Sequence, residues 1–530
     1  MTRRRAAAEY LGVAALGLLV LAVHDVAYLL RAPFWVDEAW VAVTTRFPLS
    51  QLPAVTSSTP IGWSALLRLV TVPGQQTGRL LPLAFAGAAV VIAYWLARRL
   101  RWPWAPASVL AGLLAATAAL MVPAMLVRDD LKQYTADACL SLLVLALTAR
   151  LEAGWSRRRL AALSVAIWGG LLFSDAVAFT GAAALGAVCL VQLARRDGRR
   201  LAEAVVTSAV TAVLMAAVYL AFYARAVVPG LTAYWAAFYL PLHRGLHSKV
   251  AFLTGKFHVI HAFFGLGPAW LAVPLVIAGL ITLGWLGHAA TAIAVAALWP
   301  EMLALSALRK YPFLDLRTST FLIAITAVVA AIGVAGLCAL LRHWLGRAGA
   351  PALAAALTAA AIAAATAGGF AAAAAPYAPS HLIPREGDVR DQARYVLAHA
   401  APGDVILVNA ASNWGFAYYW PAGHPGRRRD VSDLQGYVAY FPGQPRIIVA
   451  RDRDPASVSA ALDQSLAQSL ARARGGRCAR IWLVRTHQSG TEKAAWQAAE
   501  RQHHVTGRRV PGAGALQVIQ PAGPACAARP

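Results

Sequence analysis

The chain has 530 residues, of which 59% are hydrophobic and only 14% are charged, and its mean hydropathy is +0.56. Its apolar residues fall in blocks of about twenty, roughly the length of a helix that crosses the hydrocarbon core of a bilayer. This pattern excludes an ordinary soluble protein and indicates a polytopic membrane protein. The formal net charge of +24 would suggest a nucleic-acid partner in a soluble domain, but many arginines lie in short clusters between apolar blocks, as membrane topology requires. We therefore expect no nucleic acid as partner.

The first apolar block, Tyr10 to Leu30, follows Arg3-Arg4-Arg5 and so resembles the charged start and apolar centre of a signal peptide. The block is long, and no convincing small-residue cleavage site precedes Arg31. It is therefore predicted to be a retained first membrane span.

Further apolar blocks predict ten more membrane helices, so that the expected fold is an α-helical polytopic membrane protein with about eleven spans. The blocks lie at residues 80–97, 104–127, 134–149, 160–173, 176–194, 202–224, 264–285, 289–308, 319–341 and 351–371.

Arginine clusters set the predicted topology. If the N-terminus is cytoplasmic, the clusters within 98–101, 157–159, 195–200 and 342–347 all fall on the cytoplasmic side, in turns that are shorter than the outer loops. We therefore expect a multi-pass plasma (inner) membrane protein with a cytoplasmic N-terminus. An odd number of spans then places the tail outside the cytoplasm.

The tail changes character at Pro376, where alanine-rich sequence gives way to polar sequence. Short apolar runs alternate with helical patterns there, which is typical of a small α/β domain with a mainly parallel sheet. The predicted division is thus 1–375, a membrane domain that contains the first outer loop at 31–79, and 376–530, an extracytoplasmic α/β domain. Its elements are predicted at 388–400, 405–408, 447–449, 455–474, 481–484 and 516–519.

Two features of the tail leave alternatives open. Cys478 and Cys526 both fall on the oxidising side, so a disulfide between them is plausible, but the sequence gives no geometry. The aromatic run from Asn413 to Trp420 could stack on sugars, and packing in a core explains it equally well.

The first outer loop contains two adjacent acids, Asp37 and Glu38, among aromatic residues. Charges at a membrane face are costly and often functional. The alternative is that the acids cap a helix or pair with Arg31 or Arg46, since structural ion pairs are common. The two acids could also hold a divalent metal with phosphate completing its shell, although two carboxylates make a thin site.

Two later outer turns carry cations. Transfer from a lipid-linked phosphate needs a carboxylate to accept the proton of an incoming hydroxyl and fixed cations to bind the departing phosphate. The alternatives are pairing with neighbouring acids and anchoring at the interface. The candidates for binding the donor phosphate are Arg128, Lys132, Tyr134, Arg309, Lys310, Tyr311 and Arg317. Asp25 and Glu301 could line the same cavity, or form hydrogen bonds between helices.

These motifs together resemble the glycosyltransferase C superfamily of membrane enzymes, in the branch similar to bacterial protein O-mannosyltransferases and the lipid A aminoarabinose transferase. The resemblance covers residues 1 to about 375. It rests on Trp35-x-Asp37-Glu38-Ala39, Thr59-Pro60-x-Gly62, the turn from Arg128 to Tyr134, and Lys310-Tyr311-Pro312-Phe313 with Arg317.

The resemblance implies a polyprenyl-phosphate sugar donor in the membrane and an acceptor that approaches from outside. Asp37 matches the family's catalytic acid and would be the general base, while Glu38 would orient the acceptor or support Asp37. Arg128, Lys132 and Arg317 would bind the donor phosphate. The acceptor classes are a glycan, a lipid or a protein. The sequence departs from the eukaryotic O-mannosyltransferases in that no large internal domain interrupts the spans, and this difference counts against a protein acceptor.

The sequence therefore predicts a cell-envelope glycosyltransferase, transferring a hexose or a pentose, with no certain cofactor. The alternatives are a transporter or flippase of a lipid-linked anionic substrate, and a catalytically inactive scaffold that binds glycan. The sequence lacks the repeated hydropathy pattern that many transporters contain, which favours the enzyme over the transporter.

Overall fold

A computed structural model of the chain describes residues 3–23, 26–52, 59–72, 75–121, 131–224, 234–261, 269–315, 317–347, 389–421, 438–439, 441–473 and 479–520. The chain divides into two compact units, and each is described by itself. Unit one comprises Met1–Val26, Arg79–Ala221 and Trp235–Ala378. Unit two comprises Ala27–Gly78, Phe222–Tyr234 and Pro379–Pro530.

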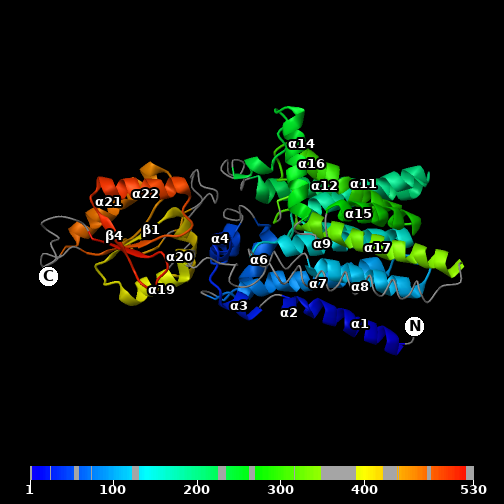
Figure 1. Cartoon of the computed structure of the whole chain (residues 1–530), viewed down its shortest axis with the longest axis horizontal. Coiled ribbons are helices and arrows are strands. Elements are labelled where there is room, and N and C mark those ends of the chain that lie inside the picture. The colour runs from blue at the N-terminus through cyan, green and yellow to red at the C-terminus, as the bar shows by residue number, and fades with distance from the viewer. Residues whose placement is uncertain are drawn as a thin grey trace. The chain divides into compact units, whose positions relative to one another are not determined.

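Unit one is helical throughout its described part (Figure 1). Its helices are α1 (Arg3–Leu18), α2 (Val20–Val23), α7 (Leu80–Arg98), α8 (Ala105–Met121), α9 (Tyr134–Ala153), α10 (Arg157–Gly170), α11 (Ala176–Ala194), α12 (Gly198–Val218), α14 (Leu246–His261), α15 (Ala269–Trp285), α16 (Ala289–Ala307) and α17 (Thr320–Arg347).

Five described helices are long and apolar enough to cross a membrane, which confirms the prediction of a helical multi-pass protein. They are Thr77–Arg98, Ala176–Ala194, Gly198–Tyr223, Ala289–Ala307 and Thr320–Trp344. The total of eleven spans stays a prediction, because the block at 351–371 lies outside the described residues. Within the first block the structure describes α1, α2 and α3 (Val26–Arg31), while residues 24–25 lie outside the described part of the chain.

Small residues let two apolar helices, α15 and α17, approach closely. A Cβ at Gly279 would lie 2.0 Å from the carbonyl oxygen of Val329, and one at Gly333 would lie 2.2 Å from that of Leu275. Close contact through glycine is the usual means of packing apolar helices in a membrane, where apolar burial gives little drive for association. These glycines therefore position α17, on whose N-terminal side the predicted Arg317 lies.

Unit two contains a five-stranded mixed sheet with the order β2-β1-β3-β5-β4. The strands β2 (Ile447–Val449), β1 (Val405–Val408) and β3 (Ile481–Val484) are parallel, whereas β5 (Gln517–Gln520) and β4 (Thr506–Arg509) are antiparallel to their neighbours. The runs predicted as strands form β1, β2 and β3, and the last one, predicted at 516–519, forms β5 one residue later. The sequence prediction missed β4 because its four residues, Thr-Gly-Arg-Arg, contain no apolar side chain.

Unit two also contains helices. They are α3, α4 (Val36–Thr44), α6 (Ile61–Val70), α19 (Val389–His399), α20 (Asn413–Tyr419), α21 (Pro455–Ala471) and α22 (Gly490–Gln502). One buried core joins Val405 and Leu407 of β1 and Ile481 and Leu483 of β3, which share a face of the sheet, to residues of α21 and α22; these are Val458, Leu462 and Trp496. Helix α20 packs against α4, so the first outer loop belongs to the same compact unit as the tail. The predicted division at 375 remains a prediction.

Candidate functional site

Helix α4 presents the two acids of the first loop differently. Trp35 precedes the helix, and its backbone N–H donates a hydrogen bond of 3.0 Å to Oε2 of Glu38. Glu38 is fully buried, whereas Asp37 is only partly buried. The contact is the reciprocal half of a capping box, which pairs an N–H that the helix leaves without a partner. The helix-capping alternative therefore applies to Glu38.

The aromatic run of the tail is part of the core of unit two. Trp414, Phe416 and Tyr418 are fully buried. The Tyr418 hydroxyl donates to the carbonyl oxygen of Gln75 at 2.6 Å, and the Tyr419 hydroxyl accepts the backbone N–H of Phe34 at 2.9 Å. Of the two interpretations, core packing is the one that the structure supports, and it fixes the segment that leads into α4.

Arg46, just after the C-terminus of α4, connects this helix to α20. Its guanidinium donates to the carbonyl oxygens of Ala417 at 3.0 Å and Trp420 at 3.1 Å, and also to that of Tyr418. These carbonyls lie at the C-terminal end of α20, where a helix leaves acceptors without partners and favours a positive charge. The acid pair thus lies on a helix held at both ends.

His487, a basic residue that the sequence did not single out, interacts with Asp37, and a second such residue, Arg453, lies near His487. The His487 ring meets the Trp35 ring edge-on, with centroids 4.7 Å apart. The His487 side chain is partly exposed, but the protein atoms around its ring remove some of its hydration and lower its pKa; Arg453 lowers this pKa further, and the negative charge of Asp37 opposes both. Arg453 and His487 follow β2 and β3, at the edge where parallel strands end. This position after parallel strands is the signal by which the sequence could have identified the two residues, because ligands of α/β sheets commonly bind at that edge.

In unit one, the two turns predicted to bind phosphate lie together. Tyr134 begins α9, and burial raises the pKa of Tyr311 well above its ordinary value, with Asp137, Asp175 and Tyr134 adding to the effect. The Tyr311 hydroxyl donates to the carbonyl oxygen of Thr318 at 2.8 Å. The acids Asp137 and Asp175 therefore border these turns, and the local charge is mixed.

Arg317 is paired within its own turn. Its Nε lies 3.9 Å from Asp315 Oδ2, and its guanidinium lies 5.7 Å from the centre of the Trp235 ring. Lys256 of α14 is a further cation near Asp315 that the sequence prediction missed. Burial lowers the pKa of Lys256 to about 8, and Asp315 opposes this change.

The other predicted site residues differ in burial. Lys132 is almost fully buried, while Arg309 and Lys310 are exposed. Glu301 is half-buried within α16. Outside the described residues lie Asp25, Arg128, Cys478 and Cys526.

A metal site finds little support in the part of the chain that the structure describes. No group of three or more His, Cys, Asp or Glu side chains is placed there to hold an ion. Of the two acids in the first loop, Glu38 is buried and accepts the Trp35 N–H. The acid pair therefore does not fit a metal.

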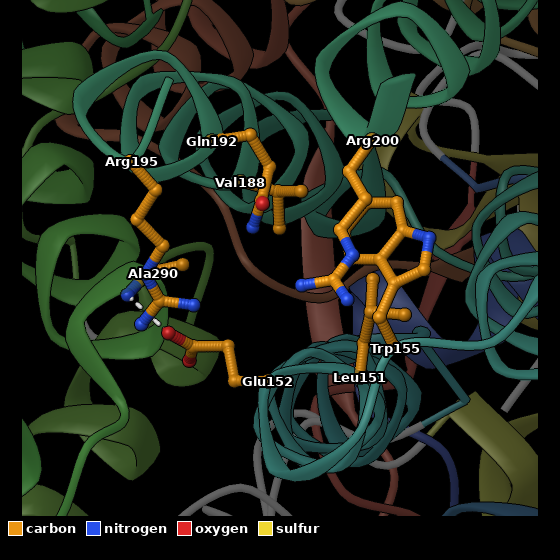
Figure 2. A pocket seen from close by; sticks show the side chains of 8 residues that line it. All are labelled: Leu151, Glu152, Trp155, Val188, Gln192, Arg195, Arg200 and Ala290. Atoms are coloured by element: carbon orange, nitrogen blue, oxygen red, sulfur yellow. Dashed lines mark hydrogen bonds between the residues drawn. The ribbon is translucent and has the colours of Figure 1, made fainter. Parts of the chain in front are cut away.

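A pocket in unit one involves none of the predicted site residues (Figure 2). Glu152 points into it and accepts hydrogen bonds from the backbone N–H groups of Ala290 at 2.6 Å and Thr291 at 2.9 Å. A carboxylate there caps the N-terminus of α16. The residues that line the pocket are Leu151, Glu152, Trp155, Val188, Gln192, Arg195, Arg200 and Ala290.

Comparison with solved structures finds a likeness in fold to the membrane proteins ArnT and AglB, in agreement with the resemblance predicted from the motifs. The similar structures include ArnT from Cupriavidus metallidurans, a lipid A aminoarabinose transferase. Bound to undecaprenyl phosphate, it has a TM-score of 0.55 and 13% identity, covering 98% of this chain and 99% of its own. In the apo state its TM-score is 0.56, also at 13% identity, covering 99% of this chain and 100% of its own.

A second similar protein is the archaeal oligosaccharyltransferase AglB from Archaeoglobus fulgidus, in complex with an inhibitory peptide and a dolichol-phosphate. Its TM-score is 0.52 at 11% identity, covering 96% of this chain and 74% of its own. No protein-family profile and no curated protein sequence matches the chain. At such low identities the likeness concerns the fold alone.

Proposed function

We propose that this protein is an integral membrane glycosyltransferase that moves a sugar from a polyprenyl-phosphate donor to an acceptor hydroxyl on the extracytoplasmic face. The observation that carries the proposal is the similarity in fold over nearly the whole chain to ArnT bound to undecaprenyl phosphate. The sugar would be a hexose or a pentose. The acceptor would be a glycan, a lipid or a protein of the cell envelope.

In the proposed reaction, the Asp37 carboxylate accepts the proton of the acceptor hydroxyl as its oxygen attacks the anomeric carbon of the donor. The bond between that carbon and the phosphate oxygen breaks, and its electron pair leaves with the phosphate. Lys132, Arg317 and Arg128 would bind the phosphate as its negative charge grows. Partial exposure of Asp37 supports its choice as base over Glu38, whose carboxylate is buried at the helix cap.

Sugar transfer tests this proposal with purified full-length protein in nanodiscs. The donors are labelled undecaprenyl-phosphate-linked mannose, glucose, galactose, arabinose and aminoarabinose, and membranes from a strain that lacks the gene supply the acceptor. We expect Asp37→Asn to lower transfer by about 100-fold or more, because the amide accepts no proton. Binding of undecaprenyl phosphate should persist in this variant and weaken in Arg317→Ala.

A matched control is Asp391→Asn, which neutralises an acid of the same unit whose carboxylate lies 3.2 Å from Arg390. Transfer should be unchanged in this control. Full activity of Asp37→Asn would remove Asp37 as the base. Absence of transfer by the wild type with every donor would favour the transporter alternative, in which the same cations bind phosphate and Asp37 is structural.

A further inference from the structure

The loops that follow the parallel strands of unit two form a connected polar network. Asn409, directly after β1, donates from Nδ2 to Oε1 of Glu492 at 2.9 Å and to the carbonyl oxygen of Thr486 at 3.1 Å. The backbone N–H of Thr486 donates back to Oδ1 of Asn409 at 3.3 Å. Asn409 and Glu492 are fully buried, so these bonds form in a low-dielectric setting. The network fixes the backbone next to His487.

Arg453 and His487 extend this network towards α4. Arg453 Nε lies 4.0 Å from Oε2 of Glu492, and this ion pair positions the Arg453 guanidinium. His487 has a φ of +47°, a left-handed conformation that is uncommon for residues other than glycine. This conformation turns the imidazole to the edge of the Trp35 ring, two residues before Asp37. A constrained backbone of this kind persists only where its surroundings support it, and the Asn409 bonds provide that support.

We propose that His487 is a positioning residue for Asp37: held by Asn409 and Glu492 through Thr486, its ring fixes Trp35 and contributes a neutral partner beside the carboxylate. The inference rests on the proposed function, since it assigns to the tail unit a part in the same reaction. Its consequence is that the α/β tail belongs to the catalytic apparatus, and does more than enclose it.

The charges that act on His487 are those of Arg453, from the loop after β2, and Asp37, from α4. Because burial and Arg453 lower its pKa, the imidazole is neutral at neutral pH. Protonation at lower pH would place a positive charge near Asp37 and make the carboxylate a weaker base. Transfer should therefore fall as the pH decreases through the pKa of His487.

The first arm of the test needs no activity. Hydrogen–deuterium exchange at the imidazole C2 position, followed by mass spectrometry over a pH series, gives the pKa of His487 in the full-length wild type and in Asp37→Asn. Loss of the Asp37 charge should lower this pKa further, because that charge raises it in the wild type. An unchanged pKa would refute the coupling and overturn the inference.

The second arm measures transfer with whichever donor the wild type uses. His487→Asn is chosen because asparagine tolerates the left-handed conformation and so keeps the loop. We expect kcat to fall about 10- to 100-fold with an unchanged KM for the lipid donor, and the acidic limb of the pH profile to move to lower pH. A matched control is His399→Asn, since His399 is also exposed and stacks on Tyr395 with ring centroids 4.0 Å apart.

Activity of His487→Asn equal to that of the wild type, or an equal loss in His399→Asn, would overturn the inference. A wild type that transfers no sugar would refute the proposed function instead. The exchange measurement would in that case still decide whether Asp37 and His487 are coupled.

Discussion

At the scale of single residues, two neighbouring carboxylates have different surroundings. Glu38 is the third residue of α4, and its side chain turns back to the N–H of Trp35. Asp37 is the second residue and remains partly exposed, and its charge acts on His487. A sequence can place two acids side by side, but the helix register decides which one is buried at the helix cap and which one stays partly exposed.

This difference predicts separate effects on stability. Glu38→Ala should lower the free energy of unfolding of unit two by about 1 to 2 kcal/mol, because a buried capping bond is lost. Glu38→Gln retains an acceptor oxygen and should cost less. Asp37→Ala, as the matched variant, removes a partly exposed acid near the helix N-terminus and should cost about 0.5 kcal/mol through the helix dipole.

Reversible denaturant unfolding in detergent, monitored by hydrogen exchange of the α4 amides, measures these changes. A larger loss in Asp37→Ala than in Glu38→Ala would contradict the assignment of Glu38 as the cap.

At the scale of elements, the attachment of α20 to α4 depends on Arg46. Its fork reaches three carbonyl groups at the end of α20. Arg46→Ala should destabilise unit two by about 3 kcal/mol, because several hydrogen bonds from a charged donor are lost together. Arg46→Lys keeps the charge but not the planar fork, so about half of that loss is expected.

Hydrogen exchange of the amides at 413–420 and limited proteolysis would report this loosening. Arg68→Ala serves as the control, since Arg68 is exposed and donates a long hydrogen bond of 3.4 Å to the Thr45 carbonyl oxygen. Equal protection of the 413–420 amides in Arg46→Ala and in the wild type would refute the proposed attachment.

The strands show how far local patterns reach. Runs such as Val405–Val408 and Ile481–Val484 are wholly buried, so four consecutive apolar residues predicted them. The edge strand Thr506–Arg509 has no such run, because edge strands are often polar and charged. The interaction of Asp37 with His487 was not predictable for a different reason: the two residues lie 450 positions apart in the sequence, and only the tertiary fold, which local sequence does not encode, brings them near each other.

At the scale of the whole molecule, the orientation in the membrane is the property on which the proposed function most depends. The acceptor must meet Asp37 on the same side as the tail, and the arginine clusters predict that this side is extracytoplasmic. An odd number of spans between a cytoplasmic N-terminus and the tail satisfies both conditions.

Reporter fusions test this arrangement in intact cells. Alkaline phosphatase, which folds only under oxidising conditions, should be active when fused after Pro530 and inactive when fused after Gly154, in the turn before the Arg157–Arg159 cluster. Green fluorescent protein should give the opposite pattern. Replacing Arg157, Arg158 and Arg159 with alanine should weaken the orientation and raise phosphatase activity at Gly154, because these cations hold that turn inside. Phosphatase activity at Gly154 in the unmodified chain, with none at Pro530, would place Asp37 in the cytoplasm by the predicted span order and exclude an extracytoplasmic acceptor.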